Sequence, residues 1–149
     1  MPEFSKYLSQ ERVAILEAKN KRQAIDETLE LLRGSPSLAD FDRVAAAIWQ
    51  REEALATGLG LGIATPHVRN SAVRFPIAAL GVLRKGVDYG SFDAAPVRLI
   101  LLVAMPEESQ GEWLRYLARA SAIFRDDAMR HKLFAASASE ALWDLVKEH

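Results

Sequence analysis

The chain contains no cysteine. This absence excludes disulfide bonds, thiolate nucleophiles and cysteine-ligated metals, and it suits a reducing cytosol. Residues 1–6 lack the basic and apolar regions of a signal peptide, and apolar runs such as residues 99–105 are too short to cross a bilayer. We therefore expect a cytoplasmic protein with no direct membrane insertion.

The chain also lacks an excess of charge of either sign. Its 19 Lys and Arg residues face 20 Asp and Glu residues, which leaves a net charge of −1. This balance leaves no excess of basic residues that would bind the phosphates of nucleic acid, so we expect no nucleic-acid partner. Half of the 149 residues are hydrophobic and no internal repeat or linker is visible, which predicts a single globular domain over residues 1–149.

Histidine is scarce and does not follow the spacing of metal ligands. The three histidines are His67, His131 and His149, without an H-E-x-x-H or H-x-H arrangement. We therefore expect no metal site. His131 lies between two basic residues of a helical pattern, which predicts a solvated surface residue. Phosphate-loop, dinucleotide-fingerprint and G-x-S-x-G motifs are also absent.

Helical patterns lie at both ends of the chain and surround a strand-rich centre. Helices are expected to open at Asn20 and Asp40, both good N-caps, and Ser137 with Glu140 resembles a cap of the final helix. The expected strands are residues 13–16, 63–66, 77–83 and 97–104. One helix face is expected to carry Trp113, Leu114, Leu117, Ser121 and Phe124. This order predicts a sheet covered by helices on both faces.

The most informative segment is the glycine-rich run over residues 58–67, which ends in His67. Pro66 fixes its own φ and biases Thr65 toward an extended conformation, so His67 is expected in a well-defined place. A neutral imidazole attacks a phosphoryl group without a separate base. Arg51 ends the preceding helix and offers a fork of donors for phosphoryl oxygens, to which glycine N–H groups are expected to add.

Each of these residues also has a purely structural interpretation. His67 is also explained as a histidine with satisfied hydrogen bonds in a loop, and Arg51 as a solvated cation favoured by the helix C-terminus. The glycines are also explained as a helix stop followed by a strand start. Trp113 suits the core or a pocket wall. Glu52 and Glu53 are expected to be surface charges.

A longer stretch carries a family resemblance. Residues 50–67 read Q-R-E-E-A-L-A-T-G-L-G-L-G-I-A-T-P-H, close to the pattern R-E-x-x-x-S/T-G-x-G-x-G-I-A-x-P-H. This resembles the IIA components of the bacterial phosphoenolpyruvate-dependent phosphotransferase system, of the fructose/mannitol class that includes the nitrogen-regulatory proteins. The similarity continues through residues 96–106 and covers nearly the whole chain. It implies a single α/β domain with a mixed β-sheet sandwiched between helices.

The resemblance also implies a chemistry, which needs no cofactor. His67 is expected to accept a phosphoryl group at Nε2 from an HPr-like phosphocarrier, with Arg51 as the phosphoryl clamp. The group then passes to a cysteine of a IIB domain or serves as a regulatory switch. The alternative is a regulatory module that binds a partner protein, with weak or vestigial phosphotransfer. The residues expected to line the phosphate-binding pocket are Thr57, Gly58, Gly62 and Trp113.

Two positions depart from the family pattern. The second active-site histidine that family members commonly carry falls on Trp113 here. An indole has one N–H donor, which suits a hydrogen bond to a phosphoryl oxygen, but it carries no charge and accepts no proton. The glycine that often follows the active histidine is Val68 here, and its side chain restricts the backbone.

Overall fold

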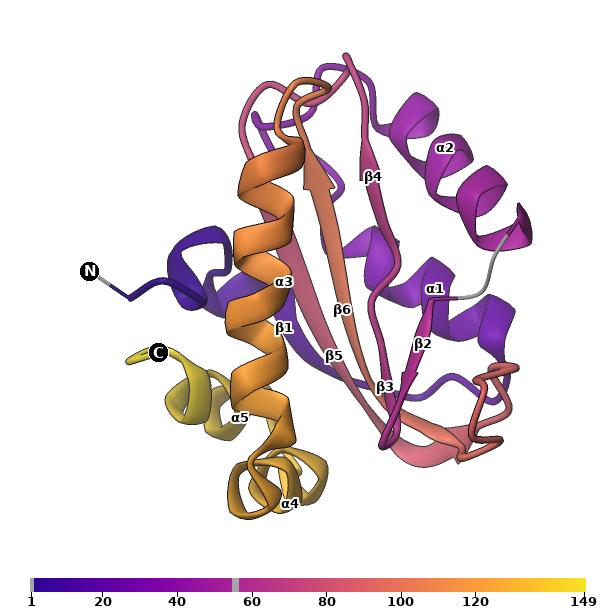
Figure 1. Cartoon of the computed structure of the whole chain (residues 1–149), viewed down its shortest axis with the longest axis vertical. Helices are drawn as coiled ribbons and strands as arrows, with labels where there is room; N and C mark the ends of the chain where they lie inside the picture. The colour runs from indigo at the N-terminus through magenta and orange to yellow at the C-terminus, as the bar shows by residue number, and fades with distance from the viewer. Residues whose placement is uncertain (1, 55–56) are drawn as a thin grey trace.

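A computed structural model gives the structure of the protein and describes residues 2–54 and 57–149 (Figure 1). Residues 55 and 56 of the motif quoted above lie outside the described residues. Two short 3-10 helices, Ser5–Tyr7 and Gln10–Arg12, open the chain. The elements that follow are β1 (Val13–Leu16), α1 (Lys21–Glu30), α2 (Phe41–Ala54), β2 (Gly58–Gly60), β3 (Ile63–Ala64), β4 (His67–Arg69), β5 (Ile77–Val87), β6 (Val97–Met105), α3 (Gln110–Arg125), α4 (Asp127–Ala135) and α5 (Ser139–Val146).

The six strands form one mixed sheet in the order β1-β5-β6-β3-β2, with β4 also paired to β6. β5 and β6 are antiparallel, whereas β1 pairs with β5 in parallel and both β3 and β4 pair with β6 in parallel. β3 and β4 therefore follow one another along the same edge of β6, separated by Thr65 and Pro66. This arrangement sets His67 opposite Val103 of β6.

Helices cover both faces of the sheet, as expected (Figure 1). α1 and α2 pack on one face, and α3, α4 and α5 pack on the other. β6 is buried on both faces because its side chains alternate between the two cores. Ile100, Leu102 and Ala104 belong to the core under α1 and α2. Leu99, Leu101 and Val103 belong to the core under α3.

Most local predictions are confirmed. Asn20 caps α1 by accepting from the Gln23 N–H at 2.9 Å, and Asp40 accepts from the Arg43 N–H at 3.1 Å at the start of α2. The predicted cap at Ser137 is wrong, because α5 starts at Ser139 and its N-cap is Ala138, without a side-chain hydrogen bond.

The predicted inner face of α3 is partly wrong. Trp113 and Phe124 are buried, but Leu114 is 55% exposed. Tyr116, Ala120 and Ile123 complete the buried face instead. The buried face of α3 is therefore rotated about the helix axis from the expected one, which leaves Leu114 on the surface near the start of the helix.

A tight turn joins β2 to β3. Gly60, Leu61 and Gly62 all have positive φ, at 83°, 59° and 80°. Glycine adopts this region without strain, so two glycines at the turn allow the hairpin to form. The turn returns the chain along β6 and leads directly to Pro66 and His67.

Candidate functional site

His67 lies on β4 with one ring nitrogen held by the backbone. Its Nδ1 lies 2.8 Å from the carbonyl oxygen of Thr65. A carbonyl only accepts hydrogen bonds, so in the neutral ring Nδ1 carries the proton and Nε2 carries the lone pair. The backbone is itself anchored, because the Pro66 carbonyl accepts from the Val103 N–H of β6 at 3.0 Å. The unprotonated Nε2 and its lone pair therefore have a fixed direction.

Arg51 reaches His67 from the last turn of α2. Its Nε donates to Nε2 of His67 over 3.1 Å. α2 packs over β4, so the two residues meet although they belong to different elements. The remaining guanidinium N–H groups are donors that suit phosphoryl oxygens.

Trp113 approaches His67 from the other side, on the first turn of α3. The two ring centroids are 4.1 Å apart and the ring planes differ by 23°, so the rings are stacked. The indole is only 6% exposed and belongs to the core under α3. Trp113 therefore serves both the core and the wall of the site, and it presents its face to the imidazole.

A surface cavity of about 560 Å³ lies beside these three residues. Its lining consists of Arg51, His67, Val68, Arg69, Glu107, Gln110, Trp113 and Leu114. The second guanidinium, from Arg69, also donates to the Glu107 carbonyl oxygen at 3.3 Å. Arg69 was not predicted as a site residue from the sequence. Its spacing from His67 was a usable signal, because residues two apart on a strand share one face.

The surroundings keep His67 uncharged near neutral pH. Burial lowers the pKa of His67 below its usual 6.5, and the nearby charges of Arg51 and Arg69 lower it further. The Thr65 carbonyl and the more distant Glu52 carboxylate act in the opposite direction, but the pKa stays lowered. A neutral imidazole with an unprotonated Nε2 is the form that acts as a nucleophile.

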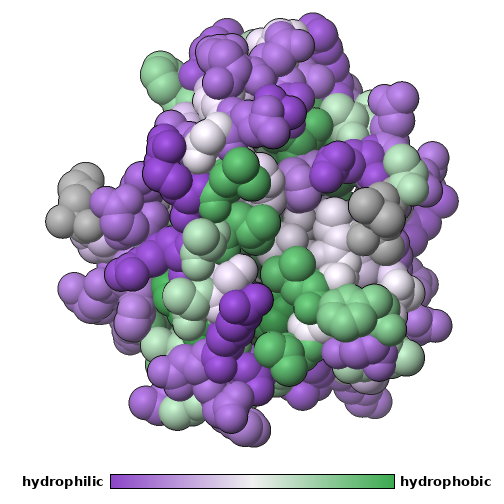
Figure 2. All heavy atoms as spheres, viewed as in Figure 1, coloured by the Kyte–Doolittle hydropathy of each residue, from purple (hydrophilic) through white to green (hydrophobic). Residues whose placement is uncertain are grey.

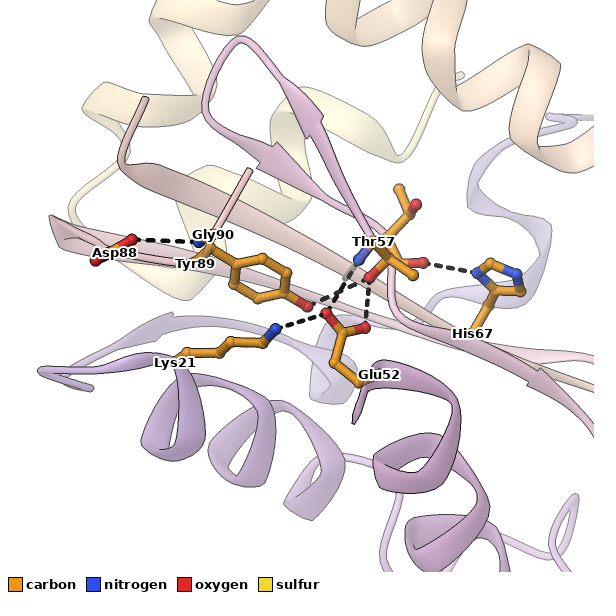
Figure 3. Close-up of polar contacts among 8 residues, drawn as sticks. Lys21, Glu52, Thr57, His67, Asp88, Tyr89 and Gly90 are labelled. Carbon is orange, nitrogen blue, oxygen red and sulfur yellow. Dashed lines mark hydrogen bonds and ion pairs between the residues drawn. The ribbon is translucent and has the colours of Figure 1, made fainter. Parts of the chain in front are cut away.

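Behind the site lies a buried polar cluster (Figure 3). Glu52, which was expected on the surface, is 4% exposed, whereas its neighbour Glu53 is exposed. Glu52 is buried because it continues the inward face of α2 at a spacing of four residues after Val44 and Ile48. Its carboxylate pairs with the Lys21 ammonium at 3.0 Å.

Thr57 belongs to this cluster. Its N–H and its hydroxyl donate to the two carboxylate oxygens of Glu52 at 3.0 and 2.7 Å, and its hydroxyl lies 3.3 Å from that of Tyr89. Its carbonyl accepts from the Thr65 N–H at 3.0 Å, and the Thr65 carbonyl in turn holds His67. Glu52 is thereby connected to His67 through two backbone segments.

Thr57, Gly58 and Gly62 do not line the cavity beside His67. Gly58 packs against Ser91 so closely that a Cβ would overlap the Ser91 hydroxyl. Gly62 needs its positive φ, and its carbonyl accepts from the Arg98 and Leu99 N–H groups at 2.8 and 3.0 Å. These residues shape the segment that presents His67, and of the four residues expected at the phosphate-binding pocket, Trp113 lies in the cavity lining.

Among residues 2–54 and 57–149, no group of three His, Asp or Glu side chains is placed to hold a metal ion. No helix within the same ranges is long and apolar enough to cross a membrane. His131 is exposed, as predicted, with Nδ1 2.8 Å from the Asp127 carbonyl oxygen.

The chain is similar to two groups of known proteins. Over 134 residues it is 34% identical to the fructose-specific EIIABC component of the phosphotransferase system of Bacillus subtilis, covering 90% of this chain and 21% of that protein. The chain thus spans about a fifth of that relative's length. Over 127 residues it is 31% identical to a nitrogen regulatory protein of Pseudomonas aeruginosa, covering 85% of this chain and 82% of that protein.

A solved structure and a family model agree with these similarities. The nitrogen regulatory protein IIA-Ntr of Neisseria meningitidis matches with a TM-score of 0.85 and 28% identity, over 95% of this chain and 97% of that chain. Residues 6–149 match the family described as phosphoenolpyruvate-dependent sugar phosphotransferase system, EIIA 2. The chain therefore belongs to the EIIA 2 family of the phosphoenolpyruvate-dependent sugar phosphotransferase system.

Proposed function

We propose that this protein is a phosphoryl carrier whose acceptor atom is Nε2 of His67. One observation carries the proposal: the Thr65 carbonyl holds Nδ1 while Nε2 faces the guanidinium of Arg51. The histidine is thus neutral, oriented and adjacent to a cation. This is the arrangement that phosphoryl transfer requires, because the protein contributes mainly positioning and charge stabilisation.

The transfer step follows from this geometry. The Nε2 lone pair forms a bond to the phosphorus of a phosphohistidine on an HPr-like phosphocarrier. The donor's P–N bond breaks, and its electron pair returns to the donor's ring nitrogen. For the Nε2 lone pair to reach phosphorus, Arg51 exchanges its hydrogen bond to Nε2 for hydrogen bonds to the phosphoryl oxygens, and Arg69 supplies a second cation in the same cavity.

The site is open to a protein partner. The cavity lies at the surface, and Leu114 at its rim is 55% exposed. Figure 2 shows hydrophobic side chains gathered in the middle of the face on which α3 lies, with hydrophilic residues around them. An apolar centre with a polar margin is typical of a protein-binding surface. We propose that the phosphocarrier and the acceptor, a IIB domain or a regulated protein, dock over this face.

Phosphorylation in a defined system tests the proposal. The protein is incubated with labelled phosphoenolpyruvate, enzyme I and HPr. We expect an acid-labile label that is lost in His67→Ala and kept in the surface control His131→Ala. Absence of label under conditions in which HPr itself is phosphorylated overturns the proposal, and so does a label that persists in His67→Ala.

A regulatory role is the second candidate. The similarity to the nitrogen regulatory protein of Pseudomonas aeruginosa favours it, because this chain covers 82% of that relative. In this role the phosphoryl group on His67 changes the affinity for a partner protein. Transfer of label to the cysteine of a purified IIB domain supports the transport role. Partner binding that differs between the phosphorylated and unphosphorylated forms supports the regulatory role.

A further inference from the structure

The stacked pair of His67 and Trp113 has a consequence for the charge of the phosphorylated ring. The indole face covers the imidazole at a centroid distance of 4.1 Å, in a position where the indole is nearly excluded from water. The face of an indole carries negative electrostatic potential and attracts a cation lying over it. A neutral imidazole gains little from this attraction, whereas a positively charged imidazole ring gains more.

The proposed transfer creates such a charge. Before transfer Nδ1 carries a proton, held by the Thr65 carbonyl, and Nε2 carries a lone pair. When that lone pair forms the bond to phosphorus, Nδ1 keeps its proton and both ring nitrogens have three substituents. The ring therefore acquires a formal positive charge, which lies directly against the indole face.

We propose that Trp113 is a cation–π partner of His67 that stabilises the ring in its positively charged, phosphorylated or protonated, form. The phosphorylated part of this inference rests on the proposed function. Trp113 contacts the reacting residue through its face and acts on the ring charge. This role differs from that of a hydrogen-bond donor to phosphoryl oxygens.

The other charged groups around the ring increase the importance of this contact. Arg51 on α2 and Arg69 on β4 are positive and oppose a charge on the imidazole. Glu107, in the segment between β6 and α3, lines the same cavity. Glu52 lies in the buried cluster with Thr57, and its negative charge favours a positive charge on the imidazole. In the proposed function both guanidiniums serve the phosphoryl group, and both oppose a positive charge on the ring, so the indole face is a separate source of stabilisation for that charge.

A cation–π contact and a simple apolar cover predict opposite changes in the unphosphorylated protein. An apolar cover only excludes water, so its removal raises the pKa of His67. A cation–π partner stabilises the protonated ring, so its replacement by an apolar side chain lowers that pKa. We would measure the pKa of His67 by NMR titration in wild type, Trp113→Leu, Trp113→Met and Trp113→Phe.

We expect Trp113→Leu and Trp113→Met to lower the pKa of His67 by about 0.4 to 1.5, and Trp113→Phe to lower it less. A rise or no change in the apolar variants overturns the inference. Fluorinated tryptophan provides a measurement that does not depend on how a variant folds. It replaces all three tryptophans but keeps their shape. It weakens the π face and is expected to lower the pKa of His67; no change contradicts the inference.

The phosphorylated form gives a second readout. At equilibrium with a phosphorylated HPr, we expect the ratio of phosphorylated to unphosphorylated protein to fall about twofold to 30-fold in Trp113→Leu, with Trp113→Phe in between. An unchanged ratio in Trp113→Leu overturns this part of the inference. If wild type accepts no label, the proposed function fails, whereas the NMR titration still decides the role of Trp113.

Discussion

The two carboxylate oxygens of Glu52 accept hydrogen bonds from the backbone N–H and from the hydroxyl of Thr57, at 3.0 and 2.7 Å. This pair joins α2, which carries Arg51, to the start of β2. The Thr57 carbonyl accepts from the Thr65 N–H, and the Thr65 carbonyl accepts from Nδ1 of His67. The relative position of Arg51 and His67 therefore depends on a buried carboxylate that does not line the cavity.

Replacement of Glu52 is expected to destabilise the fold. Glu52→Gln removes the ion pair with Lys21 and leaves an imperfectly matched amide in the buried cluster. We expect a loss of about 2–3 kcal/mol in the free energy of unfolding, measured by urea denaturation. Glu53→Gln is the matched control on the exposed side of α2 and is expected to change stability by less than about 0.5 kcal/mol. Equal effects of the two changes would contradict the role of the cluster.

The contribution of Glu52 should depend on pH. Burial alone would raise the pKa of Glu52, but hydrogen bonds from Thr57, Lys21 and Tyr89 outweigh burial and leave the pKa below 4.5. The unfolded chain therefore binds a proton at this position before the folded protein does. The stabilisation is complete above pH 4.5 and is lost as the pH falls through the lower folded-state pKa.

Urea denaturation at several pH values checks this dependence. We expect the difference in unfolding free energy between wild type and Glu52→Gln to be constant above about pH 5 and to shrink below it. A difference that stays constant down to about pH 3 would show that the carboxylate is not stabilised in its ionised form.

Arg51 should affect the rate of phosphoryl transfer more than the fold. Lysine at this position keeps the charge but loses the fork of donors, whereas alanine loses both. We expect the initial rate of phosphoryl acceptance to fall about tenfold in Arg51→Lys and about 100-fold in Arg51→Ala. Arg22→Lys, on the exposed side of α1, is the control and should leave the rate unchanged. An Arg51→Ala variant with the wild-type rate would exclude the clamp.

The rate of phosphoryl acceptance should vary with pH only on the acidic side. Burial and the two neighbouring arginines lower the pKa of His67, so the nucleophilic neutral form predominates above pH 6.5. We expect a rate that is independent of pH between about 7 and 8 and that falls below about pH 6. Rapid-quench measurements with a donor in excess separate this step from donor formation. A fall between about pH 8 and 7 would contradict a lowered pKa.

Val68 takes the place of the glycine that often follows the active histidine, and its side chain is only 8% exposed in the core under α1 and α2. Val68→Gly removes this packing and adds flexibility to β4. We expect a loss of about 2–3 kcal/mol of stability without a faster phosphoryl acceptance. Val68→Ala separates the two effects, because it removes most of the packing but adds less freedom. A faster Val68→Gly would show that the valine restricts the site.

Much of the fold is predictable because it depends on local patterns. The continuous apolar run of β6, the caps at Asn20 and Asp40 and the glycines before Pro66 each act through neighbouring residues. Strand ends are less predictable. The strand expected over residues 77–83 continues to Val87 as β5, because pairing of Val87 with Val97 of β6 extends it. Cross-strand pairing of this kind is not visible in a local window.

The sequence by itself determined the family, the layered α/β architecture and the choice of His67 and Arg51, because these follow from a long motif and from the spacing of apolar residues. Only the tertiary structure decided what surrounds His67. In the structure Trp113 stacks on the imidazole ring, Arg69 lines the cavity and Glu52 is buried. Gly58 and Gly62 do not line the cavity. These relationships join segments that are distant in the chain, and their positions depend on how α2 and α3 pack against opposite faces of one sheet.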